Sequence, residues 1–581
     1  MDANGQGPTE NTGSTSGYDT NVVKMPYDEL NNVMIPDISL PELLFQAIDM
    51  NYDVIKDRVW VGNVDSGASY KFKDIKPIAR RIASALTRLG FKKGDVLYMV
   101  TYESAFIYIV NIGVWLCGGS VRSCYQRERN DVYVEQMKEV SARFILCDHK
   151  TSAVVKGASE QLGWDVNLLS IGGQVEGTLA LEELIKNEDC SAFPDDLIIN
   201  PKEDTLVIIN TSGSTGASKG VRHTHFNYVY SLTNRGLLKK IQGIAGASML
   251  AAVGNFFSSL YFLSLSSLIR GSTFYCASTF DLKLLIQDLP KYKPDCLFLH
   301  PYAVHAFVQS DEIEKYDMNF IKIVFSGGSV LNYATAKALE TKLPHAKLTL
   351  VYGISEANKV AGTDICPPTK KPNADNRVAG IKFKTLQGDT YLTCGHLDPL
   401  VEAKIVDPVS GCSLGRNVKG SLLIKTHCFM KGYIKEGVDE DASAVLDKDG
   451  WFHTGDVAFF DEDDFLYVVD RSRFTFKYHM HWVSPTELED IILEHPAVVS
   501  AIVVGVPDPV TTSLAKAFVV LKPGQKLSEE DIKSHVAGKT EDYKHLHGGV
   551  VFVDSLPTTA GGKINRNALL KRAIAEMGST P

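Results

Sequence analysis

The sequence predicts an α/β protein with a large amino-terminal domain, built on mainly parallel sheets flanked by helices, and a smaller α+β domain at the carboxyl end. From residue 36 onward, short apolar runs alternate with segments whose apolar residues recur three and four apart. After about residue 382 the pattern changes to shorter strands separated by turns, which predicts a small β-barrel-like part. A chain of 581 residues is also too long for one hydrophobic core.

The first elements follow from composition and periodicity. Residues 1–35 open with MDANGQGPTENTGSTSG, which has almost no apolar side chain to bury, so a disordered tail is predicted. A helix is then predicted where apolar residues at helical spacing run up to a terminating glycine, at Ile75, Ile78, Ile82, Leu86, Leu89 and Gly90. Further on, the pattern predicts strands over 96–100 and 143–147 with a helix over 131–140 between them.

Three later strands are each predicted to end in a loop that contains glycine. The strands cover 206–210, 321–325 and 348–351, and the loops after them read TSGSTGASKG, SGGS and YGISE. The carboxyl ends of parallel strands open on the same edge of a sheet, and ligands bind beyond that edge. We therefore expect the three loops to converge on one crevice.

The first of these loops, 211–220, has the composition of a phosphate-binding loop. Its hydroxyl groups, backbone N–H groups and single lysine suit a polyphosphate, and glycine lets the backbone approach the anion closely. It differs from the common P-loop because Lys219 follows Ser218 and precedes Gly220. Taken alone, such a cluster is equally typical of a flexible surface loop.

The carboxyl-terminal third is predicted to contain shorter strands and a second domain. Strands are expected at 402–406 and 421–425, followed by a hairpin of 457–460 and 465–469. The piece after residue 470 begins a helix near Pro485 and has strands at 501–504, 517–521 and 550–553. The predicted domains are therefore 36–470 and 471–581.

Composition excludes several classes of protein. A formal net charge of −9 leaves no basic footprint, so nucleic acid is not an expected partner. The ten cysteines are scattered singly, as expected for free or buried thiols in a reducing compartment. The start has no signal-peptide pattern, no apolar stretch is long enough for a transmembrane segment, and the chain does not end in Ser-Lys-Leu. A cytoplasmic location is the expectation.

Five motifs in this order resemble those of the adenylate-forming superfamily, which contains acyl-CoA synthetases, 4-coumarate–CoA ligases and beetle luciferases. TSGSTGASKG resembles its phosphate loop, YGISE its adenine and magnesium motif, and WFHTGD its ribose motif. DRSRFTFKYHMHWVSPTELE resembles its hinge, and Thr559–Lys563, reading TAGGK, its carboxyl-terminal lysine loop. The resemblance covers nearly the whole chain after the tail.

The resemblance implies a mobile carboxyl-terminal domain and an AMP-forming acyl- or aryl-CoA ligase. A carboxylate oxygen attacks the α-phosphate of ATP to give an acyl-adenylate and pyrophosphate, and the thiol of coenzyme A then attacks the activated carbonyl. Because the first step brings two anions together, positioning and electrostatic stabilisation account for most of the catalysis. The implied partners are ATP, Mg²⁺, coenzyme A and a small carboxylic acid.

The resemblance also assigns site residues. The catalytic set is Lys563, Glu356, Thr215 and Lys219, with Glu356 and Thr215 at the metal. The nucleotide is bound by Thr211, Ser212, Gly213, Ser214, Thr215, Gly216, Lys219, Tyr352, Gly353, Ser355, Asp456, Arg471 and Lys477. The acid pocket contains Phe256, Phe257, Ser326, Gly327, Gly328 and Val360, and Arg473 is at the hinge. Taken singly, Asp456 fits a turn, Arg471 a surface ion pair, and Glu356 or Lys563 a solvated charge.

Three positions depart from the family pattern. Met480 replaces a glycine near the path of the coenzyme A arm, beside His479, His481 and Trp482, which indicates either a different acyl acceptor or a repacked domain interface. Phe256 and Phe257 stand where relatives often carry histidine. They predict an apolar pocket for an acyl chain or plain ring and argue against light emission. Arg473 stands where the hinge usually has Asp or Lys, and no loss is expected there.

Two other functions remain open. The protein could form the adenylate and pass the acyl group to an acceptor other than coenzyme A, or it could be a catalytically silent nucleotide-binding relative. The second alternative is disfavoured because the chain keeps together Lys219, Glu356, Asp456, Arg471 and Lys563.

Overall fold

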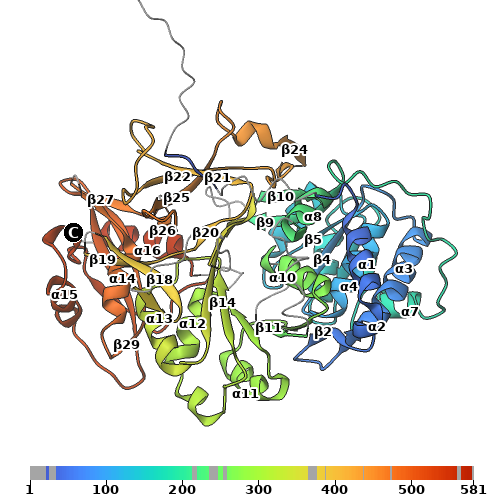
Figure 1. The fold of residues 1–581 in the computed structure, drawn as a ribbon, viewed down its shortest axis with the longest axis horizontal. Coiled ribbons are helices and arrows are strands. Elements are labelled where there is room, and N and C mark those ends of the chain that lie inside the picture. The colour runs from blue at the N-terminus through green and yellow to red at the C-terminus, as the bar shows by residue number, and fades with distance from the viewer. Residues whose placement is uncertain are drawn as a thin grey trace, which may run out of the picture.

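The computed structural model describes residues 21–24, 35–211, 219–233, 246–252, 258–363, 376–386, 388–435, 437–471, 474–479, 481–558 and 564–578. Two nine-stranded sheets, a five-stranded antiparallel sheet, a three-stranded sheet and a further five-stranded sheet make up the fold. Figure 1 shows the early, blue and cyan elements on one side, the green and yellow elements in the middle, and the red carboxyl-terminal elements on the other side.

The first nine-stranded sheet is parallel at one end and antiparallel at the other. Its order is β24 (Val438–Asp441), β23 (Gly432–Lys435), β10 (Lys219–Thr224), β9 (Thr205–Thr211), β5 (Ser120–Ser123), β4 (Val96–Val100), β6 (Phe144–Cys147), β7 (Asn167–Ser170) and β8 (Leu179–Ala180). The pairs from β9 to β8 are parallel, whereas β9, β10, β23 and β24 pair antiparallel. Strands from late in the chain thus lie beside the first glycine-rich motif (Figure 1).

Helices pack on both faces of this sheet and on one another, since Leu97 and Met99 of β4 belong to one buried cluster and Tyr98 and Val100 to another. They are α1 (Leu40–Met50), α2 (Tyr52–Ile55), α3 (Phe72–Arg88), α4 (Phe106–Leu116), α5 (Asn130–Glu139), α6 (Ser152–Ser159), α7 (Leu181–Leu184), α8 (His225–Thr233) and α10 (Ser258–Ile269). Helix α4 is apolar on all sides and buried from Phe106 to Trp115, as expected for a helix enclosed by the core. It packs closely on α3, since a Cβ at Gly113 would lie 2.5 Å from Ile82.

The second nine-stranded sheet is parallel in its centre. Its order is β20 (His396–Leu397), β16 (Asn358–Gly362), β15 (Lys347–Ile354), β14 (Ile323–Gly327), β13 (Cys296–Leu299), β11 (Ser248–Ala252), β12 (Thr273–Ala277), β2 (Val59–Asn63) and β3 (Ser69–Lys71). Helices α11 (Leu282–Tyr292), α12 (Pro301–Gln309) and α13 (Tyr333–Lys342) and the 3₁₀-helix η3 (Asp311–Lys315) connect its strands. Parallel strands joined by helices are the predicted α/β arrangement.

The predicted barrel-like part is a five-stranded antiparallel sheet with its own core. It contains β1 (Val23–Lys24), β21 (Val401–Val406), β22 (Gly420–Thr426), β25 (Phe452–Phe460) and β26 (Leu466–Arg471). Three short strands lie near it: β17 (Arg377–Val378), β18 (Ile381–Leu386) and β19 (Asp389–Leu392). The 3₁₀-helix η4 (Ala442–Val445) follows β24.

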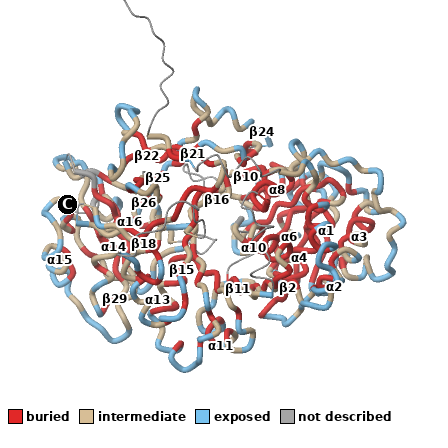
Figure 2. Tube along the Cα trace, viewed as in Figure 1, coloured by how far each residue is buried: buried red, intermediate tan, exposed pale blue. Residues whose placement is uncertain are grey.

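The carboxyl-terminal sheet forms the predicted smaller α+β domain. It contains β28 (His481–Val483), β27 (Phe476–Tyr478), β30 (Thr512–Leu521), β29 (Val498–Asp508) and β31 (Val550–Phe552). Its other elements are α14 (Pro485–Leu493), α15 (Glu529–Ala537), η5 (Asp542–Lys544) and α16 (Arg566–Gly578). Figure 2 shows buried positions along the inner strands of each part and exposed ones on the outer loops, as around α15.

Several sequence-based boundaries are wrong, and tertiary pairing explains each one. Within the predicted disordered tail, Val23 and Lys24 form β1, because Val23 pairs with Ala403 and is buried in the core of the five-stranded sheet. Strands β14, β15 and β25 run on through glycine and polar residues that were predicted to be loops. No helix in the described part of the chain is both long and apolar enough to cross a bilayer.

Candidate functional site

Three of the predicted motifs meet at Asp456. The Tyr352 hydroxyl, from β15, donates a hydrogen bond to Asp456 Oδ2 at 2.5 Å. Arg471 Nε lies 2.8 Å from Asp456 Oδ1, and the two residues are paired across β25 and β26. The proposed adenine, ribose and phosphate residues therefore form one contact group between the second sheet and the five-stranded sheet.

The surroundings of Asp456 set its protonation and that of Tyr352. Burial raises the pKa of the Asp456 carboxyl, and the Arg471 charge and the Tyr352 hydrogen bond offset only part of that rise. Burial, reinforced by the adjacent Asp456 carboxylate, raises the pKa of Tyr352 well above its ordinary value. Tyr352 therefore remains a hydrogen-bond donor, and the Arg471 side chain is 47% exposed beside this pair.

A second contact group surrounds Glu356. The Tyr433 hydroxyl, from β23, donates to Glu356 Oε1 at 2.7 Å, and Met430 N donates to the Glu356 carbonyl at 2.7 Å. Lys219 Nζ lies 4.9 Å from the centre of the Tyr433 ring, within the range of a cation–π contact. The first and second predicted motifs are thus linked through a tyrosine from a third strand.

His223 belongs to the same contact group but lies outside the predicted motifs. Its Nε2 lies 2.6 Å from the Ser355 carbonyl, and burial lowers the pKa of its imidazole to about 4. The ring is therefore neutral at pH 7 and donates from Nε2 to Ser355. The surrounding sequence, Arg222-His223-Thr224, matches no motif, so His223 is identified only by its contact with Ser355 in the folded chain.

The residues predicted for the acid pocket are placed in two different ways. Ser326 is buried at the end of β14 and Gly328 has a φ of 93°. The Gly327 carbonyl accepts a hydrogen bond from His300 Nδ1 at 2.9 Å. A Cβ at Gly327 would lie 2.6 Å from the Val351 carbonyl. Val360, in contrast, is fully buried in the core of the five-stranded sheet and exposes no surface to a ligand in this arrangement.

The remaining predicted residues either make few described contacts or lie outside the described residues. Thr211 ends β9 and its hydroxyl donates to the Lys219 carbonyl at 3.5 Å, while Lys477 lies in β27. Outside the described residues lie Ser212, Gly213, Ser214, Thr215, Gly216, Phe256, Phe257, Arg473, Met480 and Lys563.

A substitution at Gly353 tests whether the path of β15 is needed to hold Tyr352 against Asp456. A Cβ at Gly353 would lie 2.3 Å from the Asn358 carbonyl, so Gly353→Ala forces β15 away from β16 beside Tyr352. We expect a loss of about 1–3 kcal/mol in the free energy of unfolding, measured by denaturant titration, together with weaker nucleotide binding. Gly415→Ala is the control because its Cβ would meet no atom within 4 Å. Equal unfolding midpoints for the two variants would contradict this account of Gly353.

A buried group of charges joins the smaller domain to the larger one. Lys544 Nζ, from η5, lies 2.5 Å from Glu487 Oε1 in α14 and 3.4 Å from Asp389 Oδ1 in β19. The Asp389 carboxylate also accepts from Tyr391 at 2.9 Å and lies 3.3 Å from Lys419 Nζ. The side chains of Asp389, Glu487 and Lys544 are each 10% exposed or less. This contact therefore joins η5 and α14 to β19.

Glu487 is expected to make this contact depend on pH. Burial and the neighbouring Asp389 carboxylate raise the pKa of Glu487 from 4.5 to about 8. The folded protein holds the Glu487 proton more tightly than the unfolded chain does. The stability that this supplies is fully present below pH 4.5 and is lost as the pH rises from 4.5 through about 8. We expect the unfolding temperature to fall over that interval, and to fall less in Glu487→Gln, whose amide stays neutral.

Differential scanning calorimetry across pH measures this effect. Glu494→Gln is the control, since Glu494 pairs with Lys539 on the surface at the end of α14. A pH dependence that is the same in Glu487→Gln and Glu494→Gln would show that Glu487 does not cause it.

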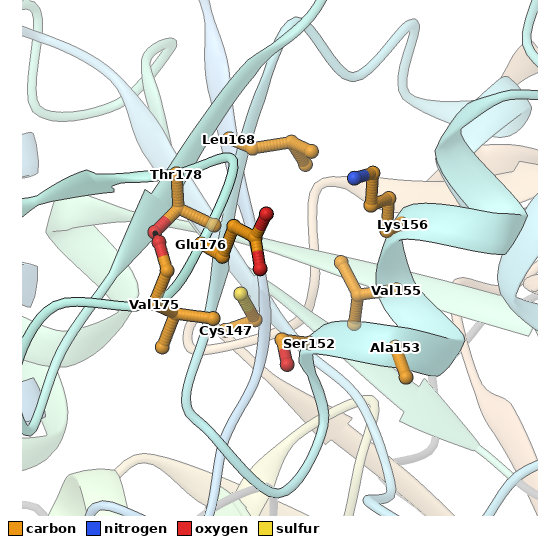
Figure 3. A pocket seen from close by; sticks show the side chains of 9 residues that line it. All are labelled: Cys147, Ser152, Ala153, Val155, Lys156, Leu168, Val175, Glu176 and Thr178. Atoms are coloured by element: carbon orange, nitrogen blue, oxygen red, sulfur yellow. Dashed lines mark hydrogen bonds between the residues drawn. The ribbon is translucent and has the colours of Figure 1, made fainter.

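A separate hollow of about 190 Å³ lies at the other end of the first sheet. Figure 3 shows side chains of α6, including Lys156, facing the loop that carries Val175, Glu176 and Thr178. Pockets for ligands of drug size usually measure about 300–1,000 Å³. This hollow contains none of the predicted site residues, and it is too small for a nucleotide.

Comparison with known proteins agrees with these motifs. The AMP-binding enzyme family matches residues 53–434, and the AMP-binding enzyme C-terminal domain matches residues 487–563. Among curated proteins, 4-coumarate–CoA ligase 4 of Arabidopsis thaliana is 29% identical over 554 residues, covering 93% of each chain.

Solved structures share the fold. Anthranilate CoA ligase AuaEII in complex with anthranoyl-AMP superposes with a TM-score of 0.77 at 21% identity, covering 94% of this chain and 99% of that one. ATP-bound MatB from Rhodopseudomonas palustris superposes with a TM-score of 0.77 at 21% identity, covering 92% and 99%. Both consist of a large amino-terminal and a small carboxyl-terminal domain in the same order along the chain.

Proposed function

The chain belongs to the AMP-binding enzyme family, and from this premise we propose that it activates a carboxylic acid with ATP and transfers the acyl group to coenzyme A. Residues 36–470 would bind ATP and the acid, and residues 471–581 would supply Lys563. The observation that carries the proposal is that the segment YGISE joins two contact groups drawn from four motifs far apart in sequence. Its Glu356 belongs to the group with Tyr433 and Lys219, and its Tyr352 to the group with Asp456 and Arg471.

Each described side chain has a defined task in this reaction. Asp456 accepts hydrogen bonds from the ribose hydroxyls, and Arg471 neutralises charge at the ribose and phosphates. Tyr352 stacks on adenine while its hydroxyl holds Asp456 in place. Lys219 binds the outer phosphates, where its charge opposes the build-up of negative charge as the acid attacks.

Glu356 fits the magnesium site that the family implies. Its carboxylate supplies the hard oxygen ligand that Mg²⁺ prefers, and Tyr433 orients it by donating to Oε1. When bound, Mg²⁺ would neutralise phosphate charge. Thr215, the other proposed ligand, lies outside the described residues.

The acyl acceptor is the less constrained half of the proposal. Strands β27 and β28 pair antiparallel, with Tyr478 opposite His481, and His479 directly follows β27. His479 has a φ of 53°, a left-handed conformation that costs a non-glycine residue roughly 1 kcal/mol or more. In the sequence the next residue is Met480, where relatives carry glycine, and this difference is the reason for keeping an acceptor other than coenzyme A as the alternative function.

One experiment separates these functions. The purified protein is given ATP and a panel of aliphatic and aromatic acids, and AMP and thioester are quantified with and without coenzyme A. Coenzyme A-dependent thioester with matching AMP supports the proposed function. AMP that forms with no thioester, and that rises when amines or alcohols are added, supports the alternative acceptor. No AMP with any acid contradicts both functions.

A further inference from the structure

The turn after α15 brings three metal-ligating side chains together. Asp542 lies in η5, and His545 and His547 follow within five residues. Their potential ligand atoms all lie within 4.8 Å of one another. The adenylation chemistry proposed above uses none of the three.

The distances suit a small divalent ion. Asp542 Oδ1 lies 3.6 Å from His545 Nδ1 and 3.5 Å from His547 Nε2. In a tetrahedral zinc site with bonds of about 2.0–2.1 Å, neighbouring ligand atoms lie roughly 3.3–3.4 Å apart. The carboxylate therefore needs to move by only a few tenths of an ångström relative to each ring. The two ring nitrogens, which lie within 4.8 Å of each other, must also approach to that spacing.

The rings are held in position by other contacts. His545 Nε2 donates to the Thr540 carbonyl at 3.2 Å, which leaves the Nδ1 lone pair free to face Asp542. A second ring N–H donated to a carbonyl is the usual arrangement of a metal-ligating histidine. The His547 ring stacks on Tyr478, with centroids 5.3 Å apart, and its Nε2 donates to the Asp542 carbonyl at 2.8 Å. To bind a metal through Nε2, the neutral His547 ring carries its proton on Nδ1 instead, and the hydrogen bond to the Asp542 carbonyl is given up.

Solvent reaches the cluster. The side chains of His545 and His547 are 27% and 33% exposed, and that of Asp542 is 75% exposed. An ion can therefore reach the ligands without any opening of the domain.

We propose that Asp542, His545 and His547 bind a borderline transition-metal ion, of which Zn²⁺ is the representative, with water in a fourth position. Two imidazoles and one carboxylate favour Zn²⁺ or Ni²⁺ over Mg²⁺ and Ca²⁺, which prefer oxygen ligands alone. The site is independent of the proposed function. Lys544, between the ligands in sequence, reaches Glu487 and Asp389, so the metal also fixes a turn that contacts the larger domain.

Titration of the untagged full-length protein with Zn²⁺ after removal of bound metal tests the proposal. Isothermal calorimetry is expected to give one ion per chain for the wild type, and Co²⁺ substitution is expected to give the visible absorption of a tetrahedral site. His545→Gln and His547→Gln are expected to lose this stoichiometric binding. His149→Gln, which removes an exposed histidine elsewhere in the chain, is expected to keep it.

Thermal unfolding excludes a folding defect. The metal-free variants are expected to unfold at the wild-type temperature, and Zn²⁺ is expected to raise that temperature only in the wild type and in His149→Gln. The proposal is overturned if the wild type binds no stoichiometric Zn²⁺, or if binding survives in His545→Gln and His547→Gln.

Discussion

Replacing Lys563 with alanine is expected to lower the rate of acyl-adenylate formation by on the order of 100- to 1,000-fold while ATP affinity stays largely unchanged. The proposed role of Lys563 is to bridge the attacking carboxylate and the α-phosphate. Its charge therefore acts where negative charge develops in the transition state. In the proposed function the nucleotide is bound mainly by the larger domain. Acid-dependent exchange of pyrophosphate into ATP measures the rate, and calorimetry measures ATP binding.

Lys571→Ala is the matched control for Lys563→Ala. Lys571 is an exposed lysine of α16, shortly after the lysine loop, and its removal is expected to leave both measurements unchanged. Equal losses of exchange and of ATP binding in Lys563→Ala would contradict the assigned role, because they would place the lysine in ground-state binding.

Replacing Asp456 with alanine is expected to weaken ATP binding by roughly 10- to 100-fold, the loss associated with one or two hydrogen bonds to a charged group. The variant removes the proposed ribose acceptor and also takes away the partner of both Tyr352 and Arg471. Because Asp456 is buried, its loss also leaves polar atoms unpaired. ATP affinity by calorimetry is the first measurement, and the free energy of unfolding is the second.

Two comparisons separate binding from stability for Asp456. Asp456→Asn keeps the shape of the side chain and an oxygen acceptor for Tyr352, so it should lose less stability than Asp456→Ala while still binding ATP weakly. Asp449→Ala, in an exposed turn, is expected to change neither quantity. Wild-type ATP affinity in Asp456→Ala would remove Asp456 from the nucleotide site.

The fold was largely predictable because its strong signals are local. The apolar run at 96–100 is β4 as predicted, and the predicted helix over 131–140 is α5, shifted by one residue. The alternation of strands and helices is also a local signal, and it predicts the parallel sheets. The domain boundary at residue 470 stays a prediction.

The ends of strands were less predictable because distant partners set them. Tyr352 and Gly353 lie inside β15 since β16 pairs with them, and Asp456 lies inside β25 since it pairs with Arg471. A single sequence shows apolar runs but not which strand will pair with a given strand. Polar residues at the ends of strands therefore resemble loops in the sequence.

Only those site residues that belong to sequence motifs were predictable. Glu356, Asp456 and Arg471 belong to motifs, whereas Tyr433 and His223 enter the site because β23 and β10 pair in the first sheet. The group of Asp389, Glu487 and Lys544 likewise spans two domains, and isolated acidic and basic residues give no signal of a buried contact.

The central claim is that the side chains around Glu356 and Asp456 bind ATP for attack by a carboxylic acid. Exchange of radiolabelled pyrophosphate into ATP, with an acid panel and without coenzyme A, tests it most directly because exchange requires reversible adenylate formation. The account predicts exchange that depends on one class of acid and is lost in Lys563→Ala. ATP binding without acid-dependent exchange, across the whole panel, would contradict it.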